Sequence, residues 1–234
     1  MYSTDRTRTR GGGPGGRLMG AGLLAFWIGL MLAVRLYPGE YDWRYMTISS
    51  LLYPDRNPRG HAWGRGGLVV CAVCALWSLL RRRRSPLGAG ALLLSTGYGC
   101  MALCALLPSP FMGVSRLHEL LALVAFILLC AGVSWMTFMV RRDAAGSADR
   151  PVDWLVPLGA AALPFVPVVC AVITQSYASR AGFPWVSLDW RARGIPVILS
   201  FALWEWITCA VCTLCLLWLL AGERSLQRVA GAAP

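Results

Sequence analysis

The chain alternates between long apolar runs and short polar segments that are rich in arginine. An α-helix rises about 1.5 Å per residue, so roughly 20 apolar residues cross the hydrocarbon core of a bilayer. The pattern therefore predicts an all-α polytopic membrane protein. Its domain covers residues 18–221 and forms a bundle of six transmembrane helices at residues 18–36, 61–80, 87–107, 118–140, 154–175 and 195–220.

Two of the six runs depart from a simple membrane helix. The apolar part of the second run covers only residues 66–80, about 22 Å of helix, so we expect that helix to recruit residues upstream. This would place His61 and Arg65 one turn apart on the same helix face. The fifth run contains Pro157, Pro164 and Pro167, which predicts a kink or partial unwinding.

Composition agrees with a membrane protein and excludes some chemistry. The chain is 57% hydrophobic and 14% charged, whereas soluble domains carry about 25% charged residues. All 22 basic residues are arginine, which excludes a lysine Schiff base and a P-loop lysine. The net charge of +11 is explained by arginines beside membrane helices that meet anionic lipid. We therefore expect membrane lipids as partners and no nucleic acid.

The arginines also predict a topology. With six helices both termini lie on one side, and a cytoplasmic assignment places thirteen arginines inside and nine outside. This bias favours a multi-pass cell-membrane protein with both termini in the cytoplasm. Residues 1–17 then form a disordered basic tail, and residues 222–234 form a short second tail.

The longest polar interruption, residues 41–65, is the first candidate site. Guanidinium groups match phosphate geometry and are held cheaply at a membrane surface. We therefore predict an anionic headgroup site in this loop, and the alternative is an ordinary solvated loop. Its candidate residues are Arg44, Arg56, Arg59, Arg65 and Asp55, together with Asp189 from the segment before the sixth helix.

Three further residues are candidates for catalysis. His61 and His118 both fall near predicted extracytoplasmic helix ends, where they could converge as an acid–base pair. Each also has a structural explanation, His61 as a turn residue and His118 as an interfacial residue at a helix start. Glu205 lies ten residues into the predicted sixth helix, about 15 Å along its axis. A carboxyl group at that depth is costly and therefore suggests function, although it could also be a structural hydrogen-bond partner.

The nine cysteines all lie inside apolar runs, where we expect them to be small packing residues. Two CxxC spacings occur, at Cys71/Cys74 and Cys209/Cys212. Redox-active pairs favour helix N-termini, where the thiolate is stabilised, and these pairs lie in helix interiors. The sequence assigns no metal ligand, and it leaves the identity of any cofactor unknown.

Two segments resemble a known layout. The segment YDWRYMTISSLLYPDRNP after the first helix resembles a loop of the bacterial and archaeal six-helix membrane family catalogued as domain of unknown function 998. The segments GYGCMALCALLPSP and SRLHELLALVAF resemble its third helix, proline-ended loop and fourth helix. The resemblance covers Tyr41 to Phe126, and Ser49, Leu51 and His118 are matching positions. Glu205 in ALWEW corresponds to a polar position in the family's last helix. The resemblance implies the fold and no activity.

Several functions remain open from the sequence. The first is an extracytoplasmic polar pocket that binds a lipid or other anionic amphiphile, with modification of that lipid by His61 and His118 as an extension. A second is a proton-coupled transporter that uses Glu205. A third is a haem- or metal-binding redox protein built on the two histidines, and a fourth is a membrane assembly factor. Whether the protein is an enzyme stays open.

Overall fold

A computed structural model describes residues 14–80, 88–107, 115–145, 155–180, 191–192 and 194–232. Within these residues the chain forms α-helices, one short 3-10 helix and no strand. The bounds are α1 Pro14–Arg35, α2 Ile48–Leu52, α3 His61–Leu80, α4 Gly88–Leu106, α5 Ser115–Ala145, α6 Leu155–Ala162, α7 Phe165–Arg180, η3 Val197–Leu199 and α8 Phe201–Ala232.

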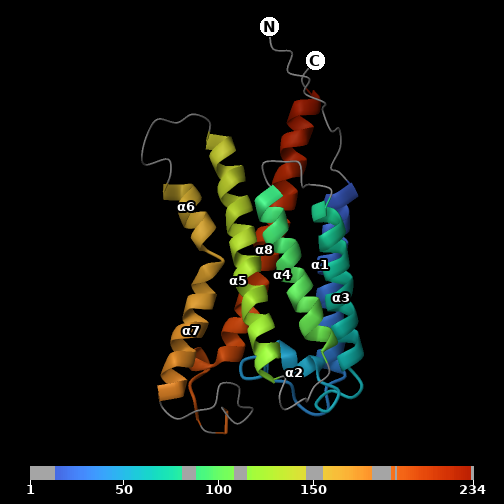
Figure 1. Ribbon diagram of the computed structural model, residues 1–234, viewed down its shortest axis with the longest axis vertical. Helices are drawn as coiled ribbons and strands as arrows, with labels where there is room; N and C mark the ends of the chain where they lie inside the picture. The colour runs from blue at the N-terminus through green and yellow to red at the C-terminus, as the bar shows by residue number, and fades with distance from the viewer. Residues whose placement is uncertain are drawn as a thin grey trace.

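The long helices run up and down side by side (Figure 1). Helix α1 descends in the view, α3 ascends, α4 descends and α5 ascends; α6 and α7 descend together and α8 returns upward. The start of α1 and the end of α8 therefore lie at the same end of the bundle. The short helix α2 lies across the opposite end, where α1 stops and where α3 and α8 begin.

Helices α1 and α3 form the most extensive pair in the bundle, and glycines set their separation. A Cβ atom at Gly29 would lie 2.6 Å from the Trp63 carbonyl oxygen and 2.9 Å from the Gly67 Cα atom. A Cβ atom at Gly67 would lie 2.6 Å from the Ala25 carbonyl oxygen. Membrane helices gain little from burying apolar surface against each other, so close backbone approach through small residues is a main source of their packing energy.

Helices α4 and α5 repeat this arrangement. A Cβ atom at Gly132 would lie 2.9 Å from the Leu94 backbone nitrogen. A Cβ atom at Gly90 would lie 3.2 Å from the Gly132 carbonyl oxygen, and one at Gly97 would lie 3.1 Å from the Leu129 backbone nitrogen. The bundle thus contains two closely packed pairs, α1 with α3 and α4 with α5, and α3 also packs against α4.

The chain is a polytopic helical membrane protein. Four helical segments in the described residues are long and apolar enough to cross a membrane, namely Gly15–Arg35, Gly88–Leu106, Leu120–Val140 and Phe201–Ala221. Large apolar side chains on these helices point outward, including Leu24, Leu103 and Leu214, each more than half exposed. Such exposed surface is expected where lipid rather than water surrounds a protein.

The fifth predicted helix is broken rather than continuous. Helix α6 ends at Ala162 and α7 begins at Phe165, with a turn at Leu163 and Pro164 between them. Proline has no N–H and clashes with the preceding turn, so Pro164 accounts for the break. This is the kink or unwinding that the three prolines predicted.

The start predicted for the sixth helix was wrong. Residues 195–200 form an extended stretch and the 3-10 helix η3, and α8 begins only at Phe201. Pro196 has an extended backbone with ψ of 140°, so a helix cannot start at residue 195. Glu205 is therefore the fifth residue of α8, about 6 Å from its start, rather than ten residues inside it.

The ends of the chain also differ from the expectation. Helix α1 already includes residues 14–17, and α8 continues to Ala232, through most of the tail predicted at residues 222–234. The rest of the predicted N-terminal tail, residues 1–13, lies outside the described residues.

Candidate functional site

The polar loop between α1 and α3 is packed into the end of the bundle. Helix α2, with sequence ISSLL, buries Ile48, Ser50, Leu51 and Leu52. It contacts α1, α3 and α8. The loop therefore closes this end of the bundle with a short buried helix instead of lying free in solvent.

An aromatic pair fixes the entry to α2. The Tyr41 hydroxyl donates toward the Met46 carbonyl at 2.8 Å and the Thr47 carbonyl at 3.0 Å. The Trp206 indole N–H of α8 donates to the same Met46 carbonyl at 3.1 Å. Burial raises the pKa of Tyr41, so its hydroxyl stays protonated and able to donate. The Trp206 bond thereby joins the loop to α8, although the two bonded residues are 160 positions apart in the sequence.

Glu205 binds the first turn of α2. Its Oε2 accepts a hydrogen bond from the Ile48 backbone N–H at 2.9 Å. Thr47 occupies the N-cap position of α2 but makes no side-chain capping bond. The first N–H groups of a helix need an acceptor, and a carboxylate from another helix supplies it here. This contact matches the structural role that the sequence left open for Glu205.

Asn57 is the buried polar anchor of the loop. Its side chain is fully buried and uses both ends of the amide. Nδ2 donates to the Ala33 carbonyl at 2.9 Å and to the Leu51 carbonyl at 3.1 Å, and Oδ1 accepts from the Gly60 N–H at 2.9 Å. One side chain thereby joins the end of α1, the end of α2 and the approach to α3.

Arg65 and His118 both contact residues at the end of α2. The Arg65 Nε donates to the Leu52 carbonyl at 2.9 Å, and its Nη2 lies 3.5 Å from the Leu107 carbonyl at the end of α4. The ring of Tyr53, the residue after Leu52, lies 5.6 Å from the His118 ring. The segment of Leu52 and Tyr53 thus brings two predicted site residues into one region.

The charge on Arg65 is the unusual feature of this region. The side chain is half-buried, as the fifth residue of α3, and its two acceptors are neutral backbone carbonyls. No acidic side chain among the described residues forms an ion pair with it. Charged groups near membrane depth are normally paired, and the described residues supply this guanidinium with no anionic acceptor.

His61 opens α3 one turn before Arg65, as predicted. Its Nδ1 lies 3.0 Å from the Asn57 carbonyl oxygen, so one ring nitrogen is already used at the helix start. Two contacts place the imidazoles: His61 lies beside Asn57, and His118 lies beside Tyr53.

The other predicted headgroup residues are at the rim of the loop. Arg44 is joined to Asp42 by two bonds, with Nε to Oδ1 at 2.8 Å and Nη2 to Oδ2 at 2.9 Å. These hydrogen bonds hold the pKa of the Asp42 carboxyl below its usual value. Arg56, Arg59 and Asp55 are exposed. Asp189 lies outside the described residues.

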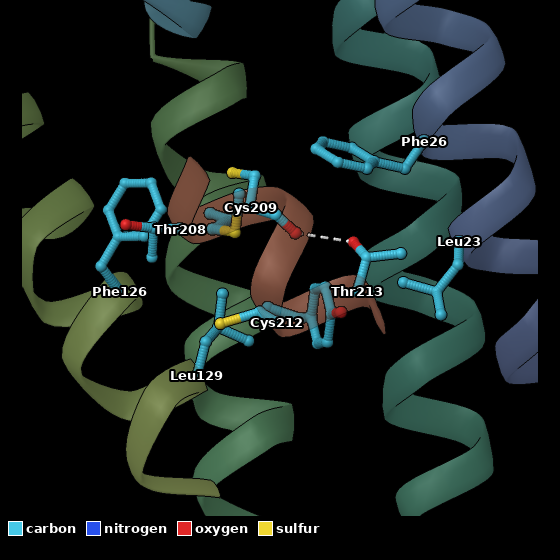
Figure 2. A pocket seen from close by; sticks show the side chains of 10 residues that line it. Leu23, Phe26, Phe126, Leu129, Thr208, Cys209, Cys212 and Thr213 are labelled. Atoms are coloured by element: carbon cyan, nitrogen blue, oxygen red, sulfur yellow. Dashed lines mark hydrogen bonds between the residues drawn. The ribbon is translucent and has the colours of Figure 1, made fainter. Parts of the chain in front are cut away.

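A small cavity lies deeper in the bundle, between α1, α4, α5 and α8 (Figure 2). Its volume is about 20 Å³, room for about one water molecule. Phe26 and Phe126 line it on opposite sides, with Thr208 and Cys209 of α8 between them. This space is too small for a lipid chain or an organic cofactor.

The cysteines are free thiols within the described residues. Cys130 and Cys212 contact each other, with the sulfur atoms 3.7 Å apart. Among the residues described, no three His, Cys, Asp or Glu side chains are grouped to hold a metal ion. Five of the nine cysteines are buried, namely Cys71, Cys104, Cys130, Cys209 and Cys212.

Sequence reasoning missed four residues that organise the site, namely Tyr41, Tyr53, Asn57 and Trp206. Nothing in the sequence near Tyr41 or Trp206 indicates that both residues bond the Met46 carbonyl. Asn57 did carry a signal. It lies between Arg56 and Pro58, and asparagine is a common turn residue because its amide bonds nearby backbone groups.

Comparison with protein families identifies the chain. Residues 20–221 match the family described as protein of unknown function (DUF998), so the chain belongs to this family. No curated protein and no solved structure matches it.

Proposed function

We propose that this DUF998 family member binds the anionic headgroup of a lipid or similar amphiphile at the end of the bundle closed by α2. Arg65 would be the primary ligand, with His118 and Tyr53 beside it. The single observation behind this proposal is that the half-buried Arg65 guanidinium has only two neutral carbonyls as acceptors in the described part of the chain. An anionic oxygen would complete its hydrogen bonding and balance its charge.

The membrane arrangement is part of the proposal. In it, six segments cross the bilayer: the four long apolar helices, α3, and α6 with α7 as one broken crossing. Both termini are cytoplasmic, which follows the arginine bias of the sequence and fits the common end of α1 and α8. The α2 end is then extracytoplasmic, and the headgroup site faces the outer leaflet.

Headgroup binding is tested by native mass spectrometry of protein purified in lipid-retaining detergent and supplied with phosphatidylglycerol or phosphatidylcholine. We expect discrete adducts with the anionic lipid, and their loss in Arg65→Gln. The matched control is Arg35→Gln, because Arg35 is an exposed arginine at the same end of the bundle. Equal anionic-lipid binding by both variants would show that general surface charge, and not this site, holds the lipid.

A second variant separates binding from chemistry. His118, whose ring contacts Tyr53 next to the Arg65 acceptor Leu52, carries an imidazole of the kind used for proton transfer. If the site modifies its lipid, His118→Gln should keep the lipid adduct and remove the product. Turnover that persists in this variant would restrict the proposal to binding.

The transport alternative depends on Glu205 as an intramembrane proton carrier. The Ile48 N–H already occupies one of its oxygens, and this contact favours a structural role. No observation in the described residues favours the redox or assembly alternatives over headgroup binding.

A further inference from the structure

A second polar region lies on the other side of the bundle, at the break between α6 and α7. The break is beside the middle of α5, because the Cys130 thiol donates to the Pro164 carbonyl at 3.3 Å. Cys130 is central in the apolar segment Leu120–Val140. Pro164 is fully buried, which agrees with the rule that non-helical backbone at membrane depth is covered by protein.

Two hydroxyl groups continue the α5 face that carries Cys130. Ser134 and Thr137 follow it at four and seven residues, so the three side chains share one helix face. Ser134 is 9% exposed and Thr137 is 3% exposed. Neither hydroxyl has a hydrogen-bond partner in the described structure. A buried hydroxyl without a partner costs about 1–3 kcal/mol, so two on one face need an explanation.

The broken helix offers an acceptor at the same depth. Pro164 has no N–H with which to bond the Ala160 carbonyl four residues earlier. Helices α5 and α6 run in opposite directions (Figure 1) and pack together. One turn up α5 from Cys130 is Ser134, and one turn back along α6 from Pro164 is Ala160. The Ser134 hydroxyl and the Ala160 carbonyl are therefore at the same level.

The ligand class follows from these atoms. The Ser134 and Thr137 hydroxyls and the Ala160 carbonyl are neutral oxygen donors, which suit a hard cation. A divalent ion generally requires carboxylates, and this face of α5 offers none. The last turn of α6 adds the partial negative charge of a helix C-terminus. Discontinuous membrane helices bind alkali cations with such carbonyl ends near the bilayer midplane.

We propose that Ser134, Thr137 and the end of α6 form a binding site for an alkali cation, sodium or potassium, between α5 and the broken α6–α7 segment. This site is separate from the Arg65 region, and it binds a cation where the headgroup site binds an anion. Occupancy stabilises the packing of α5 against the broken α6–α7 segment.

Thermal unfolding at constant ionic strength in sodium, potassium or choline chloride tests the proposal. We expect sodium or potassium to raise the Tm relative to choline, by about 3–6 °C for each tenfold rise above the Kd. The double variant Ser134→Ala, Thr137→Val should abolish this dependence. The control Ser95→Ala, Thr96→Val should keep it, because both of those hydroxyls already bond the Leu92 carbonyl.

Each outcome decides the proposal. Equal Tm values in all three salts would overturn it and leave water as the partner of the hydroxyls. A dependence that survives in the double variant would place the cation elsewhere and also overturn it. Lipid binding through Arg65 is measured independently, so either proposal can fail without the other.

Discussion

Replacing Asn57 by alanine should be among the most damaging single changes at the α2 end of the bundle. The side chain serves three buried backbone groups, the carbonyls of Ala33 and Leu51 and the N–H of Gly60. Leaving a buried polar group unpaired costs about 1–3 kcal/mol. With partial relaxation, the free energy of unfolding should fall by about 3–5 kcal/mol.

The magnitude is measured by reversible unfolding of the reconstituted protein, followed by tryptophan fluorescence. Asp55→Ala is the matched control, since Asp55 is exposed in the same loop and should change stability by less than about 0.5 kcal/mol. A loss below about 1 kcal/mol for Asn57→Ala would refute the reasoning. It would mean that water reaches this loop and replaces the amide.

Three further predictions follow from single contacts. Glu205→Gln should keep most of the stability, because an amide oxygen still accepts from the Ile48 N–H. Glu205→Ala should lower the free energy of unfolding by about 1–3 kcal/mol. Equal losses for the two variants in unfolding assays would contradict a capping role. Gly29→Ala should lower the Tm, because its Cβ meets backbone atoms, while Gly20→Ala, with open space, should be neutral or stabilising on the same helix. The pKa of Asp42 in the folded protein is lowered below its usual value of 3.8. The ionised Asp42 carboxylate therefore stabilises the fold at neutral pH, and this stabilisation is lost as the pH falls through the lowered pKa. Asp42→Asn should therefore show a smaller loss of Tm than the wild type between about pH 6 and pH 3.

The sequence predicted a structural element correctly where a single local property, such as helix length or the presence of proline, decided it. The start of α3 at His61 followed from helix length against membrane thickness, and the break near Pro164 followed from the chemistry of proline. The predicted start of the last helix was wrong because residues 195–199 are apolar, and hydropathy alone does not separate an extended apolar stretch from a helix. Membrane sidedness was predicted from arginine placement alone and stays a prediction.

The candidate site was harder to predict, because its contacts join distant segments. Arg65 was identified by residue type, but its bonds to the Leu52 and Leu107 carbonyls depend on how the end of α2 and the end of α4 meet. Glu205 was identified by depth, and the helix it caps is more than 150 residues away in sequence. Residue type and position indicate which side chains are unusual, and only the fold indicates what they contact.

The bundle divides into a closely packed part and a looser one, and this division bears on where it can move. In the α1–α3 and α4–α5 pairs, glycines bring backbone against backbone, so sliding either pair would create clashes or lose many contacts at once. The α6–α7 segment lacks a continuous hydrogen-bond ladder at Pro164 and packs against α5, which carries two buried hydroxyls with no partner in the described structure. Movement there disturbs fewer fixed contacts, so a ligand at the break would change the structure more than one at the Asn57 anchor.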